Sequence, residues 1–158
     1  MHYVLWRNQG QEVEMKKLNN EAIILLGHGS RIPGAGEGME QVASRMREKL
    51  GREIIEICYM SKLGPHFPEV FERCVEQGAT KIFVVPYFLH SGLHLNEDIP
   101  DLLCEKARAY PHVKLILGKN LGFDECLVDL VIKRLEESQN LPDIRELRRP
   151  GELVKERE

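Results

Sequence analysis

Long hydrophobic runs are missing from this sequence, and so is the pattern of a secretory leader. The purely apolar run Ala22 to Leu26 is far shorter than the roughly 20 residues that a membrane-spanning helix requires. The first 14 residues lack the apolar core of a secretory signal, because polar side chains from Arg7 to Gln11 interrupt them. We therefore expect a cytoplasmic protein with no membrane partner.

Cysteine is scarce, and positive charge does not dominate. The four cysteines stand far apart and form no CxxC pair, which argues against a zinc knuckle or an iron–sulfur cluster. A formal net charge of −3, with no block of Lys and Arg interleaved with aromatic residues, disfavours nucleic acid as a partner. We expect reduced thiols that are mostly packed in the protein interior.

Length and composition predict one folded domain with two different ends. A chain of 158 residues, 42% hydrophobic and 30% charged, is long enough to bury a core and has a globular composition. We expect this single domain at residues 21–138. Residues 1–20 show little periodicity, which predicts a loosely ordered N-terminal extension. Residues 139–158 are strongly charged and contain two prolines, which predicts a loose C-terminal tail.

Four apolar segments rich in β-branched residues predict the strands of a sheet. These segments are residues 22–26, 54–59, 81–89 and 113–117. The intervals between them leave about 20 residues for a helix and its loops, as each crossover between parallel strands requires. The spacing therefore predicts repeated βαβ units.

Helical periodicity fills the segments between and after these strands. From Phe67 to Val75 the apolar residues share one helix face, and Gly78 follows as a stop signal. Similar stripes lie at residues 39–50, 99–107 and 127–135, and Asp98 is a candidate N-cap for the third helix. The order predicts an α/β fold, a doubly wound open parallel sheet of about four strands with helices on both faces.

Histidines follow two of the predicted strands. Gly27-His28-Gly29-Ser30-Arg31 comes after the first strand, and His90-Ser91-Gly92-Leu93-His94 comes after the third. Ligands of open parallel sheets bind beyond the carboxyl ends of the strands, where the winding direction changes. If these two strands are neighbours, the imidazoles of the two loops can converge.

Paired imidazoles suit a metal that is bound and then passed on. Neutral imidazole is a ligand for Co, Ni, Fe and Zn, and near neutral pH it can exchange a metal or a proton. We favour this role for His28 over that of a turn residue between glycines, and for His94 over that of a helix-capping residue. His90 is a further candidate ligand, which could instead pack beside Phe88 or face solvent. On these residues alone, the hypothesis is a metal or anion site at a switch point.

The motifs around the two loops resemble those of a known enzyme family. Three segments carry the resemblance and follow in this order: Leu26-Gly27-His28-Gly29-Ser30-Arg31, Val84-Val85-Pro86-Tyr87-Phe88-Leu89, and Gly92-Leu93-His94 with Asp98-Ile99-Pro100. Their order and intervals resemble the small form of the sirohydrochlorin chelatases, the CbiX family. The resemblance runs over roughly residues 22–135.

The resemblance implies a class II chelatase. Such a lyase inserts a divalent ion, cobalt in the first place and iron or nickel as alternatives, into sirohydrochlorin for cobalamin, sirohaem or a related tetrapyrrole. It has no permanently bound cofactor, because the metal is its substrate. The two metal-site histidines of the family correspond to His28 and His94. Small members pair as homodimers, so we expect a homodimeric sirohydrochlorin cobaltochelatase or ferrochelatase.

Sirohydrochlorin carries carboxylates, and a protein of net negative charge must bind them through local contacts rather than through a long-range attractive field. We expect backbone N–H groups and loop cations to bind them, and an apolar rim to cover the faces of the macrocycle. The expected substrate-binding residues are Gly29, Ser30, Arg31, Lys62, Phe88, Leu89 and Gly92.

One position departs from the family pattern. In many relatives an acidic residue stands four positions before the proline that follows the second strand, and this chain has Ser61 there. The proton acceptor therefore stays open between Glu56, Glu97, another group, or the histidines with water. His66, which we otherwise interpret as a surface turn residue, and His90 are candidates for partial compensation.

Two other functions use the same residues. A metallochaperone or metal sensor would need the histidines but no large apolar cleft. A phosphate-ester hydrolase or transferase could bind its anion on the loop at residues 27–31. However, the sequence shows no carboxylate cluster for a second metal and no GxxxxGK[ST] motif, so this function ranks third.

Overall fold

The structure of the chain is a computed structural model, and it falls into two compact units. It describes residues 5–8, 11–14, 20–30, 32, 34, 36–60, 64–90, 92 and 97–146. The two units comprise Met1–Gly122 and Phe123–Glu158. The helix expected at residues 127–135 belongs to the second unit, whereas the division into an extension, a domain and a tail stays a prediction.

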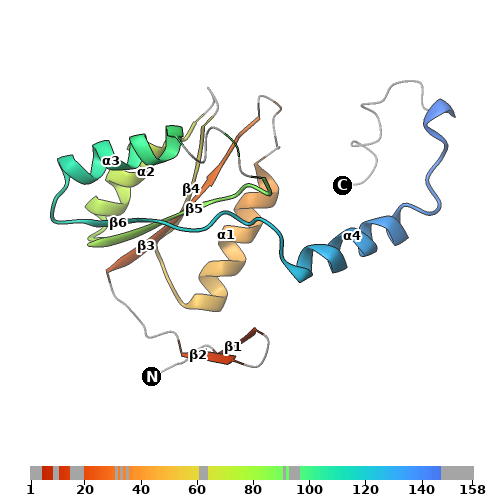
Figure 1. Cartoon of the computed structure of the whole chain (residues 1–158), viewed down its shortest axis with the longest axis horizontal. Coiled ribbons are helices and arrows are strands. Elements are labelled where there is room, and N and C mark those ends of the chain that lie inside the picture. Colours follow the sequence, from red (N-terminus) through yellow and green to blue (C-terminus); the bar gives the residue numbers. More distant parts are fainter. Residues whose placement is uncertain are drawn as a thin grey trace. The chain divides into compact units, whose positions relative to one another are not determined.

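A four-stranded parallel sheet forms the centre of the first unit (Figure 1). Its strand order is β4-β3-β5-β6, so the two strands followed by the histidine loops, β3 and β5, lie side by side, which is the condition for these loops to converge. The chain runs from β3 outward to β4 and then crosses back to β5, so the winding direction reverses between β3 and β5. The strands are β3 (Glu21–Gly27), β4 (Ile55–Tyr59), β5 (Lys81–Pro86) and β6 (Lys114–Leu117).

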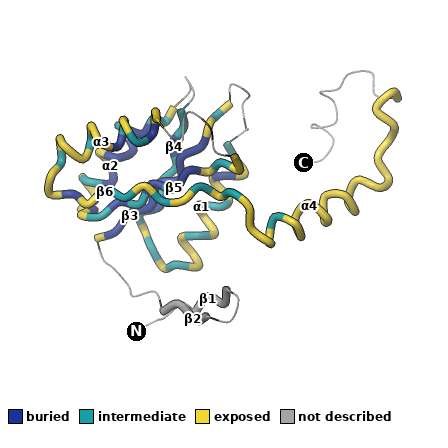
Figure 2. The backbone as a smooth tube through the Cα atoms, viewed as in Figure 1, coloured by how far each residue is buried: buried dark blue, intermediate teal, exposed yellow. Residues whose placement is uncertain are grey.

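Three helices cover the two faces of this sheet (Figure 1). Successive residues of β3 point to opposite faces, and Leu26 packs in a cluster with Phe71 while Leu25 packs in another with Met39. All of β3 is buried, as Figure 2 shows, because helices cover both of its sides. The predicted doubly wound α/β fold is thus confirmed. The helices are α1 (Glu37–Leu50) on the Met39 side, and α2 (Phe67–Glu76) and α3 (Ile99–Ala109) on the other.

The end of β5 and the start of α3 differ in detail from the sequence prediction. Strand β5 ends at Pro86 instead of Leu89, because β6 ends at Leu117 opposite Val84 and β3 extends only one residue beyond Leu26, the partner of Pro86. Asp98 does stand at the N-cap of α3, but its backbone is already helical and its side chain makes no capping hydrogen bond. Residues 87–90 therefore leave the sheet at its carboxyl edge.

A separate antiparallel hairpin lies near the N-terminus. Strand β1 (Leu5–Asn8) pairs with β2 (Gln11–Glu14), and the register places Leu5 opposite Glu14. The hairpin falls within the stretch that we expected to be loosely ordered, so this part of the predicted extension contains regular backbone pairing.

The second unit consists of α4 (Glu125–Glu137) and a 3-10 helix at Ile144–Glu146. Asp124 caps α4, and its side chain accepts a hydrogen bond from the Cys126 N–H at 3.1 Å. Helix α4 buries none of its residues (Figure 2). No helix in the described part of the chain combines the length and the apolar character needed to cross a membrane.

The four cysteines are all free thiols. Cys58 and Cys74 are buried, and burial raises the pKa of each thiol to about 12. Cys104 and Cys126 are exposed, so the expectation of packed thiols holds for two of the four. The two buried cysteines pack in the apolar core between the sheet and α2, where their thiols stay protonated.

Candidate functional site

The carboxyl ends of the central strands are joined by backbone hydrogen bonds. The Leu26 carbonyl accepts a bond from the Tyr87 N–H at 2.8 Å, directly after β5. The next carbonyl, that of Gly27, accepts from the Met60 N–H at 3.0 Å, directly after β4. The loops after β3, β4 and β5 therefore meet at the switch point of the sheet.

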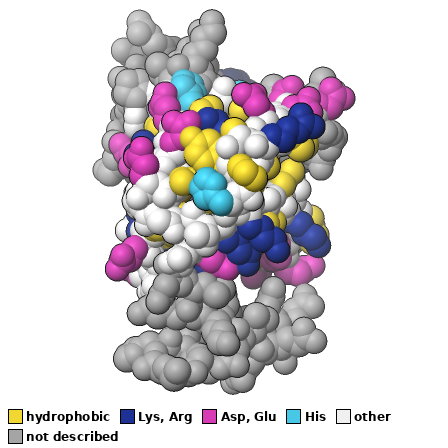
Figure 3. Space-filling model, turned by 90° about the vertical axis from the view of Figure 1, so that its left-hand side faces the viewer, with side chains coloured by type: hydrophobic (Ala, Val, Ile, Leu, Met, Phe, Trp, Pro, Cys, Tyr) yellow, Lys and Arg dark blue, Asp and Glu magenta, His cyan; other side chains and the backbone are white. Residues whose placement is uncertain are grey.

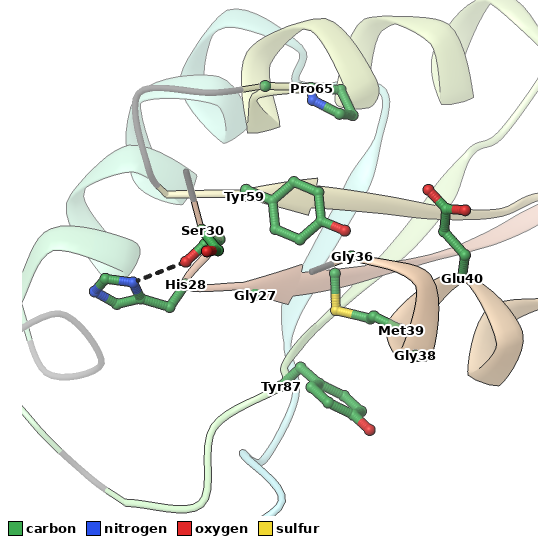
Figure 4. A pocket seen from close by; sticks show the side chains of 12 residues that line it. Gly27, His28, Ser30, Gly36, Gly38, Met39, Glu40, Tyr59, Pro65 and Tyr87 are labelled. Carbon is green, nitrogen blue, oxygen red and sulfur yellow. Dashed lines mark hydrogen bonds between the residues drawn. The ribbon is translucent and has the colours of Figure 1, made fainter. Parts of the chain in front are cut away.

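A cavity of about 560 Å³ opens at this edge (Figure 4). The loops after the three strands and the start of α1 form its wall. A volume of this size is typical of sites that bind organic ligands. The lining residues are Gly27, His28, Gly29, Ser30, Gly36, Gly38, Met39, Glu40, Tyr59, Gly64, Pro65 and Tyr87.

Glycines shape the wall after β3. A Cβ at Gly27 would lie 3.1 Å from the Met39 sulfur and 3.3 Å from Cδ1 of Tyr59, so a larger residue would push these side chains away. Gly29 has a φ of 84°, a left-handed conformation that costs glycine least. The backbone therefore passes close to the cavity and turns sharply there, as the Gly-His-Gly sequence suggests.

His28 lies on the cavity wall as predicted. Its side chain is exposed, and Nδ1 lies 3.4 Å from the carbonyl oxygen of Gly29 (Figure 4). This contact leaves Nε2 as the ring nitrogen that faces away from that carbonyl. Next along the loop, the Ser30 hydroxyl accepts a hydrogen bond from the Ile32 N–H at 3.1 Å, which stabilises the turn. The loop thus presents an imidazole on a structured backbone.

The second predicted loop is described only in part. His94 lies outside the described residues, and so do Arg31 and Lys62. Among the residues of this loop that are described, His90 and Gly92 are exposed, and Leu89 is 51% exposed.

Three of the predicted site residues, His28, Gly29 and Ser30, come together at the cavity. Phe88 instead packs against the buried core. Phe88, Leu89, His90 and Gly92 are not part of the cavity lining.

Three of the candidate proton acceptors considered in place of an acidic residue at 61, namely Glu56, Glu97 and His66, are not part of the cavity lining. Glu56 forms an ion pair with Arg73 at 3.1 Å, and neither it nor Glu97 lines the cavity. His66 stands at the N-cap of α2, where its Nδ1 lies 3.4 Å from the Tyr59 carbonyl oxygen. In the described part of the chain, no three His, Cys, Asp or Glu side chains group as a metal cage would require.

Tyr59 and Glu40 are ionisable residues of the cavity lining that were not predicted from the sequence. Tyr59 is the last residue of β4 and Glu40 lies in the first turn of α1. Burial raises the pKa of Tyr59, and the negative charge of Glu40 adds to the effect. Tyr59 could have been found from the sequence, because it is a polar residue at the end of a strand that neighbours β3. No sequence pattern pointed to Glu40.

A family model for CbiX matches residues 22–138. The chain belongs to the CbiX family. It is 33% identical to a sirohydrochlorin ferrochelatase of Priestia megaterium over 128 residues, which are 78% of this chain and 48% of that protein. It is also 33% identical to a sirohydrochlorin cobaltochelatase of Methanocaldococcus jannaschii over 138 residues, covering 72% of this chain and 96% of that protein.

Solved structures of this family share the fold. The sirohydrochlorin chelatase SirB from Bacillus subtilis subspecies spizizenii, in complex with cobalt, superimposes with a TM-score of 0.69 at 33% identity. That match covers 75% of this chain and 50% of SirB. A cobalamin biosynthesis CbiX protein from Marinobacter aquaeolei VT8 has a TM-score of 0.62 at 32% identity and is covered over 99% of its length. The chain thus spans about half the length of the ferrochelatases it matches, and nearly all of the shorter relatives.

Proposed function

We propose that this CbiX-family chain is a chelatase that inserts a divalent metal ion into sirohydrochlorin. The observation that carries the proposal is His28 on the wall of a cavity of about 560 Å³ at the switch point of the sheet. Relatives named sirohydrochlorin ferrochelatase and cobaltochelatase support this substrate. The metal is a substrate, and we propose cobalt first. Iron and nickel stay as alternatives, because imidazole ligands do not by themselves select among these ions.

The proposed mechanism requires a metal site that binds its ion weakly enough to release it to the tetrapyrrole. Insertion exchanges water and protein ligands of the metal for ring nitrogens, while two pyrrole N–H protons leave. His28 and His94, with water in the remaining positions, would hold the ion more weakly than a closed four-ligand cage. Each imidazole can accept a pyrrole proton once its metal has moved to the ring.

Substrate carboxylates are proposed to bind at the loop after β3. Gly29 and Ser30 line the cavity there, and their backbone N–H groups are the proposed donors, with Arg31 and Lys62 as the proposed counter-charges. On the face of the molecule in Figure 3, Lys and Arg side chains are interspersed with Asp and Glu, and the described side chains form no broad basic surface. Because the formal net charge of the chain is −3, the proposed basis of recognition is local contacts rather than a long-range attractive field.

The proposal is tested by the absorbance of sirohydrochlorin in the presence of Co²⁺, Fe²⁺ and Ni²⁺ in turn. We expect the protein to accelerate the change from the metal-free to the metal-bound spectrum with at least one of these ions. A metallochaperone would behave differently. It would retain stoichiometric metal and leave the tetrapyrrole spectrum at the uncatalysed rate, which would refute the chelatase function.

We propose further that the working species is a cytoplasmic homodimer. A ring with eight carboxylate arms is wide compared with the edge of a four-stranded sheet, so a second copy would close the site. Sedimentation at micromolar concentration should then give about twice the chain mass of 18.2 kDa. Dilution should lower the specific activity as dimers dissociate, and a fully active monomer would contradict the proposal.

A further inference from the structure

Tyr59 holds a fixed place at the carboxyl end of β4, with its ring in the same cavity as His28 (Figure 4). Its N–H donates to the Pro65 carbonyl at 2.9 Å, which ties the end of the strand to the loop that follows. Gly36 makes room for the ring, because a Cβ at that position would collide with the Tyr59 hydroxyl. The backbone and its neighbours therefore hold the Tyr59 side chain in the cavity wall, with its hydroxyl turned toward Gly36.

The Tyr59 hydroxyl is buried without satisfying its hydrogen-bonding capacity. Among the buried side-chain nitrogen and oxygen atoms of the described residues, its oxygen is the one with no hydrogen-bond partner. Buried hydroxyl groups normally have a partner, because an unsatisfied one loses the hydrogen bonds it makes with water. The exception lies at the cavity, where a bound ligand can supply the missing partner.

The Tyr59 phenol is suited to bind a hydrogen-bond acceptor on the ligand. Burial and the nearby charge of Glu40 both raise the pKa of Tyr59, so the phenol keeps its proton at physiological pH. A protonated phenol that lacks a partner offers a hydrogen bond to a ligand oxygen. Carboxylate oxygens are the strongest acceptors for such a donor, and the proposed substrate carries them on its periphery.

We infer that the Tyr59 hydroxyl donates a hydrogen bond to one carboxylate arm of the tetrapyrrole, which makes Tyr59 a substrate-binding residue. This inference rests on the proposed function, because the acceptor belongs to the proposed substrate. The Glu40 carboxylate also lines the cavity, but it is exposed, so water screens its repulsion of the substrate arm. The neutral hydroxyl of Tyr59 is therefore available to bind a substrate carboxylate. A cationic side chain at this position would instead form an ion pair with Glu40.

Tyr59→Phe tests the inference because it removes the hydroxyl and keeps the ring. We expect the Kd for metal-free sirohydrochlorin, titrated by tetrapyrrole fluorescence, to rise about tenfold, as for the loss of a hydrogen bond to a charged group. The loss should fall on KM for the tetrapyrrole rather than on kcat. Co²⁺ affinity without tetrapyrrole should match the wild type. The urea midpoint should stay the same or rise, because no hydrogen bond within the protein is lost.

Two further variants sharpen the comparison. Tyr110→Phe is the matched control, since the Tyr110 hydroxyl bonds the Glu72 carboxylate and lies outside the cavity lining. It should bind the tetrapyrrole as the wild type does but unfold at lower urea. Glu40→Gln removes a like charge from the cavity and should strengthen tetrapyrrole binding about twofold.

The outcomes separate the inference from the function it rests on. If the wild-type protein does not bind sirohydrochlorin, the proposed function fails and the inference fails with it. If the wild type binds and Tyr59→Phe binds equally tightly, the role of Tyr59 is overturned while the chelatase function stands. A urea midpoint for Tyr59→Phe that falls as far as that of Tyr110→Phe would reveal a partner within the protein and would also overturn it.

Discussion

Replacement of His28 with alanine is expected to slow cobalt insertion into sirohydrochlorin by about 100-fold or more, and His94→Ala by a similar factor. In the proposed mechanism each imidazole supplies a metal ligand and then a proton acceptor, so loss of either would affect both steps. The rate should be measured from the sirohydrochlorin spectrum with Co²⁺ below saturation, where weakened metal binding also lowers the rate. Co²⁺ affinity of the free protein should fall in parallel.

The effect of His28→Ala should not come from unfolding. The side chain is exposed on a loop after β3, so its removal leaves the core intact and the urea midpoint unchanged. His112→Ala is the matched control, because His112 is exposed beside Tyr110 and lies outside the cavity lining. Rates close to those of the wild type in His28→Ala would remove this residue from the mechanism.

The same assay also tests the assignment within the second loop. We expect His90→Ala to reduce the rate less than His94→Ala does. The opposite order would show that His90 is the ligand of that loop and that the assignment of His94 is wrong.

The architecture was predictable because the pattern of each strand reflects its surroundings. β3 is covered by helices on both faces, so its residues are apolar without alternation, and the run from Ala22 to Leu26 marks it clearly. The handedness of crossovers limits the possible strand orders, which made the β3–β5 neighbourhood a reasonable expectation. The end of β5 was not predictable, because pairing stops where β3 and β6 stop and the apolar sequence continues to Leu89.

The candidate site was predictable only where it follows directly from chain order. His28 comes after the central strand, and any residue there lies at the carboxyl edge of the sheet. Tyr59 and Glu40 enter the cavity because α1 and β4 approach β3 closely, and that approach depends on Gly27 and Gly36 having no side chain. Phe88 shows the converse, since an apolar residue of a predicted site loop packs into the core instead.

The largest expected loss of stability lies at the opposite end of β3, at Glu21. This carboxylate is 8% exposed and contacts two cations, Lys81 at 2.7 Å and Arg52 at 3.0 Å. Glu21→Ala would leave the Arg52 side chain, itself only 11% exposed, without its carboxylate in a place that water hardly reaches. Breaking a buried ion pair on one side costs about 3 kcal/mol of unfolding free energy. That cost is a change of more than 100-fold in the unfolding equilibrium.

Glu48→Ala provides the comparison that makes the Glu21 result specific. Glu48 pairs with Arg45 at 2.9 Å, but both side chains are more than half exposed, so its loss should cost about 0.5 kcal/mol or less. Glu21→Gln should fall between the two, because the amide keeps the shape and some hydrogen bonding but not the charge. Urea titrations of the three variants measure these differences. Equal losses for Glu21→Ala and Glu48→Ala would mean that Arg52 and Lys81 become hydrated when Glu21 is absent, so that the start of β3 does not depend on this carboxylate.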